Sequence, residues 1–185
     1  HFTDRRQRQM CIRDRSACKW LVMEWDGRES SGIFVGNPIG WLLRNVNSSL
    51  ALFKDNGIRS FSKVLIAIRP GRRNKRFIDV ADKICRHFGA SLTLLNIVSE
   101  SDSNQKIKRT EKSSLELISE TKSKSLVKII KSNNPVEAIS EESASYDLLI
   151  LGTPEKDNWI SVLFGAGEDR FVKKAACSVL RLTIK

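Results

Sequence analysis

The sequence predicts an α/β fold in which a five-stranded parallel sheet is doubly wound, as in a Rossmann-like domain. From residue 62 onward, short apolar runs alternate with stretches whose apolar residues recur at helical spacing, which is the pattern of a parallel sheet with helices on its faces. The apolar runs are continuous rather than alternating, as in strands that are buried on both faces. Because the connections are short and crossovers are right-handed, the doubly wound topology is the economical one.

The predicted strands follow the apolar runs, and the first helix follows the first strand. Five apolar residues of this helix, from Phe77 to Phe88, recur at helical spacing, and Gly89 stands where a left-handed C-cap is expected. The five predicted strands cover residues 63–68, 91–98, 125–130, 147–151 and 178–184.

The remaining helices are less regular in sequence. Residues 100–110 are polar and are predicted to form a long exposed loop, followed by a helix over 111–121 that points Leu115 and Ile118 inward. The next helix has a clear start, because Asn134 can cap it, a proline follows at the first helical position and a glutamate stands at the third. The last helix is predicted over 167–175.

An internal repeat divides the chain. Residues 36–54 align without gaps on 165–183, and Lys19–Met23 corresponds to Asp147–Leu151. The repeat predicts two homologous domains in series: the C-terminal part of a first domain over 16–58 and a complete domain over 59–185, joined by a polar linker over 54–60. We expect the two copies to pack together within the chain, or the chain to form a homodimer.

The composition narrows the classes of function. The net charge of +11 is inflated by residues 1–15, which hold five arginines and resemble a translated sequencing adapter. We interpret them as a non-native tail; a natural basic arm is the alternative. No apolar run approaches membrane-spanning length. The four cysteines, Cys11, Cys18, Cys85 and Cys177, lack metal-ligand spacing, so the prediction is a soluble cytoplasmic protein without a metal, with buried structural thiols at the last two.

Residues 62–185 resemble a complete universal stress protein domain, which has an adenine nucleotide alpha hydrolase-like fold. The resemblance rests on KVLIAI, on the following helix, on YDLLILG and on the closing GAGEDRFVKKAACSVLRL; residues 16–58 resemble the last third of another copy. The tandem arrangement and CKWLVMEWDGR are similar to the cytoplasmic C-terminal region of bacterial amino-acid permease-like transporters. This second resemblance implies a membrane transporter domain upstream.

The family resemblance also implies a nucleotide site, which is degenerate in this chain. ATP-binding members carry a series of three glycines, the last followed by Ser or Thr, whose backbone amides approach the phosphates. Glu155 replaces the second glycine, Ala166 replaces the hydroxyl residue, and Arg69 replaces the family's acidic residue. We therefore predict weak ATP binding or none. The expected residues of this nucleotide- or anion-binding site are Arg69, Arg72, Gly152, Thr153, Glu155, Gly165, Ala166 and Gly167.

Two readings of the basic loop 69–76 stay open: an anion site at the crevice of the sheet, or a solvated loop. No catalytic motif is present, and His1 and His87 cannot form a pair. The prediction is a non-catalytic sensory or regulatory module without a resident cofactor. The alternatives are a nucleotide-binding stress-response protein and, as a third class, a basic nucleic-acid-binding protein, although we expect no specific nucleic acid partner.

Overall fold

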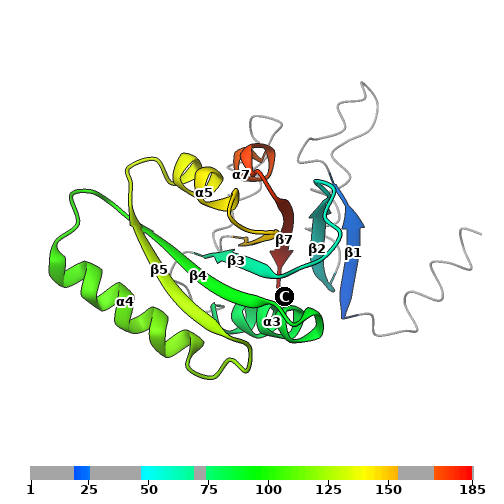
Figure 1. Cartoon of the computed structure of the whole chain (residues 1–185), viewed down its shortest axis with the longest axis horizontal. Helices are drawn as coiled ribbons and strands as arrows, with labels where there is room; N and C mark the ends of the chain where they lie inside the picture. The colour runs from blue at the N-terminus through cyan, green and yellow to red at the C-terminus, as the bar shows by residue number, and fades with distance from the viewer. Residues whose placement is uncertain (1–18, 26–46, 69–73, 154–168, 185) are drawn as a thin grey trace, which may run out of the picture.

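The computed structural model describes residues 19–25, 47–68, 74–153 and 169–184. Within these residues seven strands form one sheet in the order β1-β2-β7-β6-β3-β4-β5 (Figure 1). All neighbouring strands are parallel except β2 and β7. The predicted five-stranded sheet is present as β3 (Lys63–Ala67), β4 (Ser91–Val98), β5 (Ser125–Lys131), β6 (Leu148–Gly152) and β7 (Ser178–Thr183).

Helices cover both faces of this sheet. The helices α3 (Asn74–Phe88) and α4 (Asn104–Ile118) lie on one face, and α5 (Pro135–Ser143) and α7 (Arg170–Lys174) lie on the other (Figure 1). One apolar cluster joins α3 and α4 to the sheet and a second joins α5 and α7 to it. The central strand β3 lies between the two clusters, so its Val64–Ile66 stretch is fully buried, as its continuous apolar sequence predicts.

The helix α4 corrects the sequence prediction for residues 100–110. The predicted loop is wrong, because the helix starts at Asn104 after Ser103, whose side chain caps it by accepting from the Lys106 amide. The polar composition concealed this helix, since only a narrow stripe, including Ile118, is buried. Leu115, predicted to point inward, is 51% exposed.

The ends of the other helices agree better with the sequence. Gly89 has a φ of 67°, and the Ala90 amide donates to the Cys85 carbonyl at 2.8 Å, which confirms the left-handed C-cap. Phe88 was predicted to face the core but is 51% exposed and stacks edge-on against Phe61. The Asn134 cap is confirmed, since its side chain accepts from the Glu137 amide.

Two further strands extend the sheet beyond β7. They are β1 (Trp20–Glu24) and β2 (Ser49–Lys54). Trp20 pairs with Ser49 just as Leu148 pairs with Ser178, and the following pairs keep this correspondence. The β1–β2 pair therefore has the register of the β6–β7 pair, and β2 then joins β7 antiparallel.

The segment after β2 is bound to the start of β7. The Asn56 side chain donates to the Cys177 carbonyl at 2.8 Å, and the Asn56 amide donates to Ser178 Oγ at 2.9 Å. Asp55 accepts from the amide of Gly57, whose φ is 84°. The linker predicted at 54–60 is thus polar, as expected, but hydrogen bonds from Asn56 fix it to the start of β7.

Among the described residues, no helix has the length and apolar character needed to cross a membrane.

Candidate ligand sites at the carboxyl edge of the sheet

The strands β3 and β6 mark the point where the winding of the sheet reverses. They are parallel neighbours, with Ala67 beside Leu151. The chain leaves β3 toward α3 on one face, while α7, which follows β6 in the chain, lies on the other (Figure 1). Doubly wound sheets bind ligands outside the carboxyl ends of such strands, so Ile68 and Gly152 stand at the expected edge.

Gly152 is closely packed at this edge. A Cβ atom at this position would lie 3.1 Å from Phe77 Cε2 and 3.3 Å from Ile68 Cγ2, which is tighter than ordinary van der Waals contact. Gly152 does not have a positive φ. The need for glycine here therefore comes from the ring of Phe77, which α3 places over the end of β6, and not from a left-handed turn.

Thr153, the next predicted site residue, is turned into the sheet. Its side chain is buried, and both its amide and its hydroxyl donate to the Leu182 carbonyl at 2.9 Å. The hydroxyl also lies 2.9 Å from Thr183 Oγ1. These bonds to β7 occupy the Thr153 hydroxyl inside the protein.

A buried ion pair joins β7 to the start of α7. Asp169 caps α7 by accepting from the amides of Phe171 and Val172, and its other oxygen accepts from the Arg181 guanidinium. Arg181 also donates to the Gly152 carbonyl at 3.2 Å and lies 6.0 Å from the centre of the Phe171 ring. Both charges are almost fully buried. This pair fixes the residues on either side of the segment 154–168.

Sequence reasoning missed both partners of this pair. Arg181 is a single cation inside the apolar strand β7, and Asp169 precedes the short helix α7. A charged residue in the middle of a buried strand requires an opposite charge close by, and an aspartate directly before a helix is a common cap. These two signals together could have led to the pair.

The other predicted site residues lie outside the described residues. They are Arg69, Arg72, Glu155, Gly165, Ala166 and Gly167. The structure therefore brings together Gly152 and Thr153 from the predicted set, and adds Phe77, Asp169 and Arg181.

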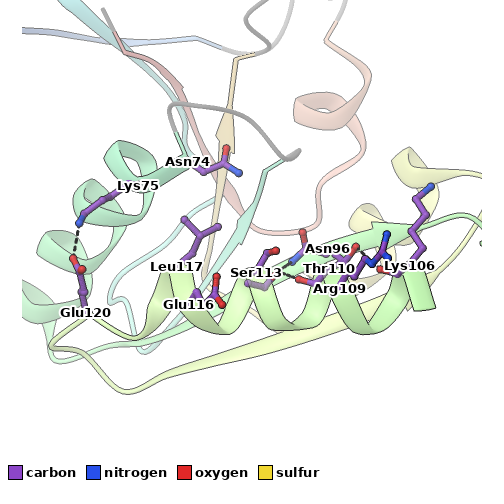
Figure 2. Close-up of a pocket in the computed structure, with 11 residues that line it drawn as sticks. Asn74, Lys75, Asn96, Lys106, Arg109, Thr110, Ser113, Glu116, Leu117 and Glu120 are labelled. Atoms are coloured by element: carbon purple, nitrogen blue, oxygen red, sulfur yellow. Dashed lines mark hydrogen bonds and ion pairs between the residues drawn. The ribbon is translucent and has the colours of Figure 1, made fainter. Parts of the chain in front are cut away.

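A groove of about 560 Å³, lined mostly by polar and charged residues, lies beside this edge, between α3 and α4 (Figure 2). Its floor carries Asn96 from β4, and α4 contributes a row of polar side chains. Lys106 and Arg109 stand toward one end of the groove, and an ion pair of 2.6 Å between Lys75 and Glu120 closes the other.

A second buried carboxylate, Asp82, has a structural role. It accepts from the amides of Lys122 and Ser123 and from the Ser123 hydroxyl, at 2.8–3.0 Å, and pairs with Arg86. Burial alone would raise the pKa of Asp82, but the hydrogen bonds from Ser123 and Lys122 and the charge of Arg86 outweigh burial and lower it. Asp82 therefore anchors the turn before β5 to α3.

The described thiols are unsuited to nucleophilic chemistry. Cys85 and Cys177 are free and buried, which confirms the prediction for these two residues. Burial raises the pKa of Cys85 to about 12 and that of Cys177 to about 11, and the thiolate is the reactive form. Within the described part of the chain, no cluster of three or more acidic, His or Cys side chains could hold a metal ion.

The comparison with protein families decides the assignment. Residues 60–182 match the model of the universal stress protein family. The chain belongs to this family. No curated protein sequence matches it significantly.

Solved structures of universal stress proteins share the fold. One from Archaeoglobus fulgidus DSM 4304 has a TM-score of 0.65 at 16% identity; the match covers 88% of this chain and 60% of that one. This chain thus spans less than two thirds of that protein. An Archaeoglobus fulgidus protein in complex with dAMP has a TM-score of 0.52 at 13% identity, covering 68% of this chain and all of that one. A universal stress protein in complex with cAMP has a TM-score of 0.55 at 14% identity, covering 69% and 100%.

Proposed function

We propose that this universal stress protein is a non-catalytic sensory or regulatory module whose nucleotide site is degenerate. The packing at Gly152 is the observation that carries the proposal. In the site that the family resemblance implies, the first glycine lets phosphates approach the backbone, whereas here the Phe77 ring lies 3.1 Å from the position that the Cβ of any other residue would take. Packing against Phe77 therefore explains the glycine at position 152 without any role in phosphate binding.

Sequence changes around Gly152 support the same conclusion. A carboxylate at Glu155 would repel the phosphates of ATP, and Ala166 lacks the hydroxyl donor found in ATP-binding members. A lost hydrogen bond to a phosphate weakens binding by about 1.5 to 3 kcal/mol, because the acceptor is charged. Arg69 in place of the acidic residue removes the acceptor for the nucleoside. Together these changes favour a module that responds to something other than ATP.

Calorimetric titration of the full chain with ATP tests the proposal. We expect no affinity tighter than about 100 µM, which corresponds to about 5.5 kcal/mol. The variant Glu155→Gly with Ala166→Ser, extended by Arg69→Asp, should bind more tightly because the repulsive charge is removed and two polar contacts are restored. Glu141→Gln, which removes one exposed charge from α5, is the matched control. Low-micromolar ATP affinity of the unmodified chain would overturn the proposal.

A nucleotide-binding stress-response protein is the second candidate. It is favoured by the family structures that contain dAMP and cAMP and by the glycines retained at positions 152 and 165. The same titration decides between the two, and it should include AMP and cAMP, since these ligands carry fewer charges near Glu155.

We further infer that residues 16–58 form the C-terminal part of a first copy of the domain. The β1–β2 register repeats that of β6–β7, and β2 joins β7 antiparallel, which supports packing of two copies within one chain over a homodimer. A monomeric mass of about 20.9 kDa by light scattering is expected. A dimer would instead favour packing between chains.

The transporter context is a separate proposal. The similarity of residues 18–28 to permease-like transporters supports a position on the cytoplasmic face of a membrane protein. Sequencing the gene upstream of the codon for residue 16 tests it. Ten or more predicted membrane helices would support the proposal, and an upstream region without them would refute it.

A further inference from the structure

Most residues that line the groove between α3 and α4 are polar or charged, whereas the neighbouring part of this sheet face is apolar. Leu92 and Leu94 of β4 are buried against the two helices, but Asn96 takes the next position on the same face. A helix that packs on a sheet normally presents an apolar stripe to it. The apolar stripe of α4 is narrow, and beside it the helix lines the groove with side chains that include Arg109, Thr110 and Ser113 (Figure 2).

Asn96 is held in place with one polar atom left for a ligand. Its side chain is 7% exposed, and its amide nitrogen donates to Ser114 Oγ at 2.8 Å. Ser114 in turn donates to the Thr110 carbonyl at 2.7 Å. Among the described residues, no donor reaches Asn96 Oδ1, although the residue lines the groove. Asn96 Oδ1 is not one of the buried side-chain atoms that lack a partner among the described residues. The oxygen is therefore accessible from the groove and can accept a hydrogen bond from a ligand there.

The charges of the groove are separated along α4. Lys106 and Arg109 lie in its first half, which has no acidic residue in the first turn, and Glu116 and Glu120 lie near its end (Figure 2). Lys106 pairs with Asp102 at 2.6 Å. The Arg109 guanidinium has no ion-pair partner among the described residues, and its donors are therefore available in the groove.

We propose that this groove binds a small polyhydroxylated anion of the sugar phosphate or sugar acid class. Arg109 binds the anionic group, because a guanidinium matches a phosphate or carboxylate with two parallel donors. Asn96 Oδ1, Ser113 and the Glu116 carboxylate bind the hydroxyl groups. The volume of about 560 Å³ is within the range of small-molecule sites.

The lining also distinguishes this ligand class from nucleotides. No aromatic ring is present among the described residues that line the groove, and Leu117 is the apolar side chain there. A nucleobase would lack a stacking surface, whereas hydroxyl groups find amide, hydroxyl and carboxylate partners. The site is separate from the Gly152 edge, and the inference does not depend on the proposed loss of ATP binding.

Calorimetric titration of the full chain with four probes tests the inference. The probes are glucose 6-phosphate, gluconate, glucose and inorganic phosphate. We expect one or both anionic polyols to bind at least tenfold more tightly than glucose and inorganic phosphate. If glucose 6-phosphate alone binds, the ligand belongs to the sugar phosphate class. If gluconate alone binds, it belongs to the sugar acid class. No binding of either anionic polyol up to 10 mM, or equal binding of glucose, overturns the inference.

Two single substitutions on α4 locate the site. Arg109→Gln should weaken binding of the anionic polyol at least tenfold. Lys112→Gln removes an exposed cation from the same helix outside the groove, and it should change affinity less than twofold. Circular dichroism checks that both variants fold. If Arg109→Gln binds as tightly as the Lys112 control, the site is not this groove. The Glu155→Gly, Ala166→Ser variant should leave this affinity unchanged, which separates this test from that of the nucleotide site.

Discussion

The buried pair of Asp169 and Arg181 offers a sharp test of how the carboxyl edge is built. Asp169→Ala removes both the helix cap of α7 and the charge that balances Arg181. Arg181→Met leaves Asp169 buried but still bonded to the amides of Phe171 and Val172. The two single substitutions therefore differ in the groups that they leave without a partner.

The expected magnitudes follow from burial. Asp169 is fully buried and Arg181 is 5% exposed, and removal of one partner of a buried pair costs about 3–5 kcal/mol. Loss of the cap adds about 1 kcal/mol for Asp169→Ala. We thus expect losses of about 5 kcal/mol for Asp169→Ala and about 3 kcal/mol for Arg181→Met. The double variant Asp169→Asn with Arg181→Met removes both charges and keeps a cap, and should lie within about 2 kcal/mol of the wild type.

Urea unfolding at pH 7, followed by circular dichroism, measures these free energies. A stability of about 5–15 kcal/mol is typical of a domain, so Asp169→Ala is expected to be marginal, and the Arg181→Met and double variants keep the test decisive. The double variant must be more stable than Arg181→Met, because it removes the unbalanced buried charge that Arg181→Met leaves at Asp169. A double variant that is no more stable than Arg181→Met, or a loss below about 1 kcal/mol for Arg181→Met, would refute the argument.

Two further predictions concern packing and pH. Gly152→Ala should lower stability by about 1–3 kcal/mol, because the new methyl group overpacks against the Phe77 ring; the additional change Phe77→Leu should recover part of the loss, and equal stability of glycine and alanine would contradict it. Asp82 has a lowered pKa in the folded state, so it stabilises the protein above its unfolded pKa of about 3.9, and this stability is lost as the pH falls through the folded pKa. The difference in urea midpoint between the wild type and Asp82→Asn should therefore shrink between pH 7 and pH 3, and a constant difference would exclude this linkage.

Structural features that depend on neighbouring residues in the sequence could be predicted, whereas features that depend on contacts between distant elements could not. The strands were found because their apolar runs are local, and Gly89 and Asn134 were found because caps depend on neighbouring residues. The α4 start was missed because its buried stripe is narrow and its groove side is polar. The position of Asn96 at the floor of the groove was not predicted either, since the sequence of an apolar strand does not show which residue its asparagine will contact.

The sequence alone determined the doubly wound sheet and its family, because both are carried by periodicity and by contiguous motifs. The tertiary structure decided what the candidate sites are made of. It placed the Phe77 ring against Gly152, joined Arg181 to Asp169, and formed a groove with Asn96 at its floor. These contacts join residues from different strands and helices, and their energies depend on burial and on directed hydrogen bonds. Neither quantity exists for a residue until the sheet and its helices have packed together.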